Sequence, residues 1–587
     1  MSCQISVPPH LLSTSGDLSS VSSGCHSAGT TTSANNASSS ALADEKRSGA
    51  PLQAAELSKR GQAHPAKITP FWCIFDRMLQ DAYCPRTNQT GVVNLGIANN
   101  SLMEAELLQF ANTHRTLEPT DLTYGTSLFG STRLFNALCH HFNTYFSPLE
   151  SVLPHHIITG PGCGSLLDQI STHVLDEGDA FLCAAPFYNG FPADAEPRAG
   201  VRVVPVYSPH GSGEGVEEEW YRGESALAGF EEAYATESGR VKAVLLCQPH
   251  NPVGRCYDRE AMIAYGRFCQ KHNLHLVSDE IYALSTFPTS DNSKPQPFVS
   301  ALSIDWEAEG VHPSRITVIY SASKDTGMNG IRVGALVTQH NPELMSAMKV
   351  TAKLNMVGSP SDALFSAVLL DPTFFPRFVA TNRARLTASY ETIKSWLKHH
   401  KISYGCSNAG HFVMVDFGPL LPEFDMDGKP ITDKRDADTL LWAKALEHKV
   451  AITPGSNYMY PRPGVFRVTF SLLPTALHEG LRRLEIVLGL DDNSWTPPKA
   501  ELVPFGLQGT SAIKNPTLAS TAAGTSSATT VQALPESVEE AILGSRRPRK
   551  RRHTEGASDF DLYTAQLPEL NMEQLTALRK AGSSCCC

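Results

Sequence analysis

The sequence predicts an α/β fold with a mostly parallel, seven-stranded sheet, followed by a smaller α+β domain. Seven short runs of almost uninterrupted apolar residues alternate with segments of helical spacing, at 155–160, 180–188, 201–208, 242–249, 274–282, 316–323 and 332–339. Apolar runs of this length are typical of strands that helices bury on both faces. We therefore expect a central sheet between two layers of helices.

Two of the segments between these runs show the spacing of amphipathic helices, "GSLLDQISTHVLDEG" and "DREAMIAYGRFCQKHN". Asp258 is expected to cap the second helix, because its carboxylate can accept the free backbone N–H groups of the first turn. Beyond residue 352 the pattern changes to a long helix at 376–400, followed by short apolar runs at 411–417, 451–456 and 466–472. This change predicts the second domain.

The two ends of the chain have the composition of disordered segments. A chain of 587 residues is too long for one compact core, and residues 1–54 are rich in Ser and Thr, with little apolar surface to offset the entropy lost on ordering. We predict a disordered segment at 1–54, an N-terminal arm with the first part of the small domain at 55–122, and a large cofactor-binding domain at 123–352. The rest of the small domain follows at 353–492, and a disordered tail occupies 493–587.

Composition excludes several classes of function. A net charge of −10 and a pI near 6.1 give no electrostatic case for a folded core that binds nucleic acid or an anionic membrane. No apolar run is long enough to span a bilayer, and the N-terminus lacks a secretory pattern. The 14 cysteines form no CxxC pair, so no metal site is indicated. We expect a cytoplasmic protein, with nuclear import through the basic cluster Arg546–Arg552 as the alternative.

Ligands of open α/β sheets bind beyond the carboxyl ends of the strands. The residues at these positions are Gly162, Cys163, Gly164, Tyr188, Asn251, Asp279, Tyr282, Ser321, Lys324 and Arg332. A lysine held among small residues loses solvation and titrates lower, which makes its amine a usable Schiff-base nucleophile. Lys324, in "SASKD", is therefore the candidate catalytic residue.

The neighbouring residue types match the parts of pyridoxal 5′-phosphate (PLP). Asp279 can hold a pyridine nitrogen protonated, and Tyr282 and Asn251 can bind a phenolic oxygen. A phosphate can lie on the backbone N–H groups near Gly162, where Ser321 adds a hydroxyl and Arg332 a positive charge. Tyr188 can stack on the ring. Far downstream, Arg467 offers a planar fork that suits a substrate carboxylate.

Taken one at a time, these residues also have ordinary structural interpretations. An Asp after a strand is often a cap or a turn residue, Asn251 with Pro252 is a turn signal, and Tyr188 could be a core aromatic. Only the whole set, in this order along the chain, points to PLP. We interpret His250 and His411 as structural residues.

From about residue 57 to 490 the sequence resembles the fold type I, class I/II PLP-dependent enzymes, and among them the 1-aminocyclopropane-1-carboxylate (ACC) synthase-like branch. The motifs that carry the resemblance, in family order, are "NLGIANNSL", "GPGCGSLLD", "APFYNGF", "QPHNPVG", "VSDEIYALSTF", "YSASKDTGMNGIRVG", "SNAGHFVMVDF", "TPGSNY" and "FRVTF". The resemblance implies that Lys324 forms the Schiff base with PLP and moves the substrate proton. It also implies that Arg467 binds the α-carboxylate and that the enzyme is a homodimer with active sites at the interface.

Departures from the family pattern bear on the reaction. ACC synthases carry Ala-Glu-Asn where this chain has Ala98-Asn99-Asn100, and Tyr-His-Gly where it has Leu128-Phe129-Gly130; Gly164 replaces a threonine. We assign Ala98 and Asn99 to substrate binding. Our first hypothesis is an aminotransferase of specialised metabolism that uses an α-amino acid and a 2-oxo acid. The alternatives are an ACC synthase-like or C–S lyase, and a catalytically silent interaction protein, which would not need Lys324 or Arg467.

Overall fold

The structure is a computed structural model that describes residues 55–64, 75–76, 78–114, 117–209, 211, 216–291, 296–425, 427–490, 494–499 and 501–505. The chain divides into two compact units, Met1–Ala512 and Ile513–Cys587, and every described residue belongs to the first. The predictions for residues 1–54 and for the basic cluster Arg546–Arg552 lie outside the described residues.

The central feature is a seven-stranded sheet in the order β2-β8-β7-β6-β5-β3-β4. Neighbouring strands are parallel except at β8, which is antiparallel to both β2 and β7. The strands are β2 (Ile157–Gly160), β3 (Ala180–Ala184), β4 (Arg202–Val206), β5 (Val241–Cys247), β6 (His275–Asp279), β7 (Ile316–Ser321) and β8 (Gly334–Val337). Six of them fall within a predicted apolar run and β5 begins one residue before its run, which confirms the predicted α/β fold.

Successive side chains of the buried strands enter two different hydrophobic cores. Leu246 of β5 packs into the α9-side core, with Leu134, Met262 and Phe365, whereas Leu245 packs into the α6-side core on the other face of the sheet. The helices that supply these two cores are α5 (Thr132–Tyr145), α9 (Arg259–His272) and α11 (Ser359–Leu370) on one face, and α6 (Cys163–Val174), α7 (Phe191–Ala199) and α10 (Pro342–Ala352) on the other.

A second, antiparallel sheet follows in the order β12-β13-β10-β9. Its strands are β9 (Ser403–Tyr404), β10 (Phe412–Asp416), β12 (Thr453–Pro454) and β13 (Val465–Thr469). A separate parallel pair joins β1 (Val93–Asn94) to β11 (Val450–Ala451), so a segment before the large sheet lies beside one that follows it by more than a hundred residues. The helices of this region are α12 (Phe374–His399), α13 (Lys434–Glu447) and α14 (Pro474–Leu488), whereas α4 (Glu104–Thr113) buries Leu107 and Phe110 in the α9-side core.

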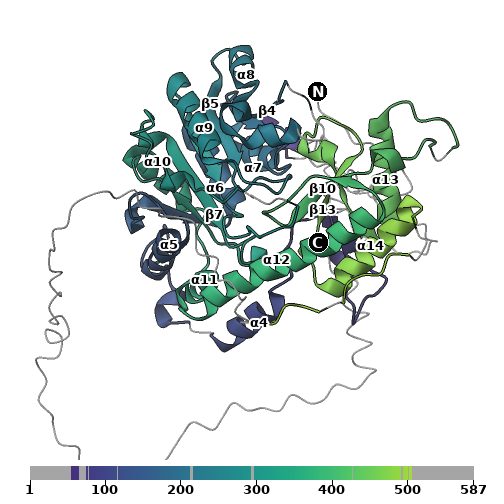
Figure 1. Cartoon of the computed structure of the whole chain (residues 1–587). Coiled ribbons are helices and arrows are strands. Elements are labelled where there is room, and N and C mark those ends of the chain that lie inside the picture. Colours follow the sequence, from purple (N-terminus) through teal and green to yellow (C-terminus); the bar gives the residue numbers. More distant parts are fainter. Residues whose placement is uncertain are drawn as a thin grey trace, which may run out of the picture. The chain divides into compact units, whose positions relative to one another are not determined.

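The long helix α12 belongs to two cores. Phe375 and Phe378 pack into the α9-side core, while Leu386, Ile393 and Trp396 pack into the small core, which also holds side chains of β10, β13 and α14. Figure 1 shows α12 lying beside α14 and below β13. Among the described residues no single helix is long and apolar enough to cross a membrane, and α11 and α12 meet that test only as a pair bent by 82°.

The described part of the chain beyond α14 lies against α12. The Val503 carbonyl accepts a hydrogen bond from Arg385 Nε (2.8 Å), and the Phe505 ring lies 5.7 Å from Phe374 and beneath the guanidinium of Arg377. These contacts fall within 493–587, the range predicted as a disordered tail. The division of the chain into domains stays a prediction.

Candidate active site

The carboxyl edge of the large sheet gathers the predicted site residues because most of its strands are parallel. Asp279 ends β6, Ser321 ends β7, and Cys163 begins α6 just after β2. Since β8 is antiparallel, Arg332, which precedes it, lies at the same edge, and Gly334 pairs with both Ser321 and Gly160. The edge thus combines a carboxylate, a helix N-terminus and a guanidinium.

Lys324 lies in this site with its amine held by the backbone of a distant segment. Its Nζ donates a hydrogen bond to the carbonyl of Ala98 at 2.6 Å. Burial, and secondly the positive charge of Arg467, lower the pKa of Lys324 from its ordinary value to about 8. The negative charge of Asp279 acts in the opposite direction. A sizeable fraction of the amine is therefore neutral and nucleophilic near neutral pH.

Asp279 is a buried carboxylate without a cation bonded to it among the described residues. Only 4 % of the residue is exposed, and one oxygen accepts the N–H of Ile281 at 3.3 Å. Burial raises the pKa of Asp279 to about 7. A protonated pyridine nitrogen would supply the missing positive partner, so this position fits PLP.

The Tyr282 hydroxyl also lacks a hydrogen-bond partner among the described residues. It is buried, and buried hydroxyls are normally satisfied. The Tyr282 ring lies edge-on to Phe412 and to His411, with centroids 5.5 Å and 5.2 Å away. The orphan hydroxyl fits a ligand that brings an acceptor oxygen, as the phenolic oxygen of PLP does.

The N-terminus of α6 forms a cradle for an anion. Gly162 caps the helix with φ 93°, and a Cβ there would come within 2.4 Å of Arg332 Nη2. Arg332 donates from the same nitrogen to the Pro161 carbonyl at 2.8 Å and from Nη1 to the Asn329 carbonyl at 3.0 Å. Its charge is thus held beside the free N–H groups of the helix, an arrangement suited to a phosphate. At Gly164 a Cβ would lie 2.8 Å from Asp194 Oδ1, so a side chain there would displace that carboxylate.

Arg467 on β13 lies buried between two aromatic rings, with its guanidinium 4.7 Å from the Phe412 centroid and 4.6 Å from that of Tyr458. Its Nη1 donates to Asn251 Oδ1 at 2.8 Å and its Nη2 to the Gly96 carbonyl at 2.5 Å, while Nε has no partner among the described residues. The fork is rigidly placed, which suits bidentate recognition of a carboxylate. Asn251 Nδ2 is then the group that would donate to a ring oxygen.

The remaining predicted residues differ in how they meet this site. Tyr188 is close enough to Asp279 and Arg467 for their charges to act on its pKa, which burial raises. Asn99 accepts the Ser471 hydroxyl at its backbone oxygen (2.6 Å), and its side-chain Oδ1 is buried without a partner among the described residues. Leu128 is 41 % exposed. The roles assigned to all these residues stay predictions.

Sequence reasoning missed a polar group behind the lysine. Asp325 accepts a hydrogen bond from the Ser285 hydroxyl at 2.6 Å, and the same hydroxyl lies 3.1 Å from His411 Nε2. We interpreted His411 as structural. The available signal was a histidine directly before the apolar run of β10, together with an aspartate directly after Lys324.

Comparisons with known proteins agree with this geometry. Residues 90–484 match the family described as aminotransferase class I and II. The chain is 32 % identical over 439 residues to the probable aminotransferase gliI of Aspergillus fumigatus, covering 74 % of this chain and 97 % of that protein. It is 28 % identical to 1-aminocyclopropane-1-carboxylate synthase 1 of Cucurbita pepo, covering 71 % and 84 %.

Among solved structures, an aspartate aminotransferase from Thermus thermophilus superposes with a TM-score of 0.56 at 20 % identity, over 74 % of this chain and 100 % of that one. This likeness confirms the predicted fold type I architecture. The family match covers well over half of the chain, and its members depend on PLP. The chain therefore belongs to the aminotransferase class I and II family and is a PLP-dependent enzyme.

Proposed function

We propose that this protein is an aminotransferase that moves the amino group of an α-amino acid to a 2-oxo acid. The observation that carries the proposal is the joint placement of Lys324, with its lowered pKa, and the buried Arg467, whose charge is one cause of that lowering. A nucleophilic amine and a carboxylate-binding fork in one site are what an α-amino acid substrate requires.

PLP, when bound, supplies an aldehyde and an electron sink for the substrate Cα. In our proposal Asp279 holds the ring nitrogen, Tyr282 and Asn251 bind the phenolic oxygen, and the N-terminus of α6 binds the phosphate with Arg332. The buried carboxylate and the orphan hydroxyl described above support these roles.

The substrate α-carboxylate lies against Arg467, which orients the bond from Cα to hydrogen toward the lysine. The Lys324 amine, whose pKa is lowered to about 8, would act as the base that removes the proton from Cα and as the acid that gives it back. The hydrogen bond from Nζ to the Ala98 carbonyl holds the amine beside Asn99, which supports its placement next to the substrate.

Asn99 favours transamination over elimination from S-adenosylmethionine. That substrate carries a sulfonium cation, which a carboxylate would stabilise, whereas position 99 here has a neutral amide. The amide Oδ1 is buried without a partner among the described residues. We therefore propose a substrate with an uncharged side chain.

We further propose that the enzyme is a homodimer. Apolar side chains are exposed along segment 117–128 and just beyond the end of α10: Leu122 is 82 %, Tyr124 80 % and Leu354 76 % exposed. Exposed apolar residues grouped in this way indicate a surface that another chain covers. Light scattering on the eluting protein measures the mass of the assembly.

The proposed reaction is tested by a single turnover of the PLP-loaded enzyme with a panel of amino acids and S-adenosylmethionine, without a 2-oxo acid. We expect one equivalent of pyridoxamine phosphate per site, followed by arrest, and chromatography of the released cofactor measures it. Continuous product release with recovery of PLP would refute transamination and indicate a lyase. No reaction with any of these compounds would refute transamination as well, and would support the alternative of a catalytically silent interaction protein.

A further inference from the structure

We propose that Asp325, Ser285 and His411 form a buried hydrogen-bonded relay that positions the Lys324 backbone against the strand pair carrying Arg467. The inference rests on the proposed role of Lys324. It goes beyond that role, because it assigns a function to three residues that touch neither cofactor nor substrate.

Asp325 ties the residue next to the lysine to the turn that follows Tyr282. It is 1 % exposed, and its Oδ2 accepts the backbone N–H of Leu284 at 2.9 Å while Oδ1 accepts the Ser285 hydroxyl at 2.6 Å. The two carboxylate oxygens thus bind two consecutive residues, one oxygen to each. A carboxylate bonded in this way fixes both the position and the direction of the chain at Lys324.

The Ser285 hydroxyl extends this connection to a second sheet. A hydroxyl has one proton, and here Asp325 accepts it, so Ser285 Oγ accepts in turn from Nε2–H of His411 at 3.1 Å. His411 directly precedes β10, which is paired along its length with β13, where Met414 faces Arg467. The relay therefore joins the lysine loop to the strands that place the carboxylate-binding arginine.

The three side chains are almost completely buried. Ser285 and His411 have no exposed surface, and burial lowers the pKa of His411, with the charges of Lys324 and Arg467 adding to the effect. A neutral imidazole with its proton on Nε2 is the form that completes the relay without adding a third positive charge. Burial also raises the pKa of Asp325 to about 7.

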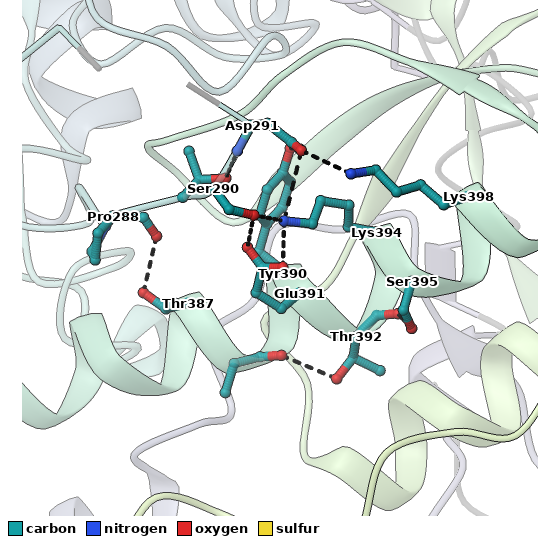
Figure 2. Close-up of polar contacts among 12 residues, drawn as sticks. Pro288, Ser290, Asp291, Thr387, Tyr390, Glu391, Thr392, Lys394, Ser395 and Lys398 are labelled. Carbon is teal, nitrogen blue, oxygen red and sulfur yellow. Dashed lines mark hydrogen bonds and ion pairs between the residues drawn. The ribbon is translucent and has the colours of Figure 1, made fainter. Parts of the chain in front are cut away.

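The segment that follows Ser285 is anchored to α12 a few residues further along the chain. Figure 2 shows the anchoring: Ser290 and Asp291 meet Lys394 and Tyr390 of α12. Lys394 Nζ donates to Ser290 Oγ at 2.5 Å, and the Tyr390 hydroxyl donates to Asp291 Oδ2 at 3.0 Å. These bonds hold the chain beyond Ser285 against α12, which supports the position of Ser285 beside Asp325.

The test uses Ser285→Ala, His411→Leu and the double variant, with Ser366→Ala as the matched control. Ser366 is equally buried and also donates to a carboxylate, Asp362, but on α11, away from the lysine. The readouts are the rate constant of PLP capture by the apo protein, which does not depend on the reaction catalysed, and the single-turnover rate constant and substrate Kd.

We expect each single variant to lower both rate constants about tenfold, since each loses a buried hydrogen bond of the relay. The double variant should be no slower than the slower single variant, because the residues act as one unit. The substrate Kd should stay within about twofold. Ser285→Thr, which keeps the hydroxyl, should restore the rates. Multiplying losses in the double variant, or an equal loss in Ser366→Ala, would overturn the relay.

A second measurement tests the direction of the hydrogen bonds in the unsubstituted protein. Nitrogen chemical shifts of ¹⁵N-histidine-labelled protein, with the His411 signal identified by its absence in His411→Leu, report the tautomer. A proton on Nε2 at neutral pH is expected. A proton on Nδ1, or a charged ring, would contradict the proposed direction of the hydrogen bonds. If the protein is not an aminotransferase, the PLP capture rates and the His411 tautomer should still be as expected here. Failure of the proposed function is therefore distinguishable from failure of the relay.

Discussion

The lowered pKa of Lys324 predicts how strongly the apo protein responds to pH. With a pKa of about 8 instead of the ordinary 10.5, about a quarter of the amine is neutral at pH 7.5, against about 0.1 % for an ordinary lysine. Capture of PLP requires the neutral amine. At this pH the lysine should therefore capture PLP about 200-fold faster than an exposed lysine of equal intrinsic reactivity.

The same shift affects stability, and its sign follows from proton uptake. Between pH 8 and 10.5 the unfolded chain binds a proton at this lysine that the folded apo protein does not. The free energy of unfolding should therefore rise with pH across this window, by about 3 kcal/mol in total. Lys324→Met should lack this rise, which makes it the matched comparison.

The assay is stopped-flow absorbance of apo protein mixed with PLP at pH 6 to 10, with borohydride trapping and peptide mass mapping to identify the modified lysine. Urea unfolding of apo protein and of Lys324→Met at pH 8 and 10 supplies the second measurement. A capture midpoint near pH 10, or the same stability rise in both proteins, would refute the reasoning that burial depresses this pKa.

Five further outcomes are expected. Arg467→Lys should raise the KM for amino acids about tenfold or more, since a bidentate fork becomes a point charge; an unchanged KM would show that another group binds the carboxylate. Asp279→Asn should weaken PLP binding about tenfold or more, measured by titration. The same variant should raise the apo Tm at pH 8, because the raised folded pKa costs stability as pH climbs from about 4 to 7; a lower Tm would contradict this. A threonine hydroxyl and two backbone N–H groups lower the pKa of Cys84 to about 7. Iodoacetamide should therefore alkylate Cys84 at a half-maximal rate near pH 7, as measured by peptide mass mapping. A midpoint near pH 9 would contradict this lowered pKa. Truncation after residue 490 should lower the Tm by a few degrees, as about 2 kcal/mol of apolar packing is lost, whereas truncation after residue 505 should not; equal Tm values would show that the segment between adds nothing.

Local sequence patterns predicted the strands and helices well where burial determines which residue types a position can hold. All seven apolar runs form strands, because a strand covered on both faces needs apolar residues at every position. Asp258 caps α9 as expected, with Oδ1 accepting the N–H of Ala261 at 2.7 Å. Parallel pairing then brings the residues at the strand ends to one edge, so the location of the site follows from the fold class.

The polar partners could not be predicted, because they join residues far apart in the chain. The bond from Arg467 to Asn251 spans 216 positions, and the contact of Ser285 with His411 spans 126. Such pairs depend on the register of two sheets and on side-chain rotamers, which hydrophobic spacing does not encode. His411 therefore looked like an ordinary core residue from the sequence.

The division of α12 between two cores has a consequence for how the protein unfolds. One continuous helix cannot lose the packing of Phe375 and Phe378 at one end without straining the packing of Ile393 and Trp396 at the other. The regions on either side of it should therefore melt together. Calorimetry of the apo enzyme should show a single cooperative transition, with equal calorimetric and van't Hoff enthalpies, even though the chain forms two separate sheets.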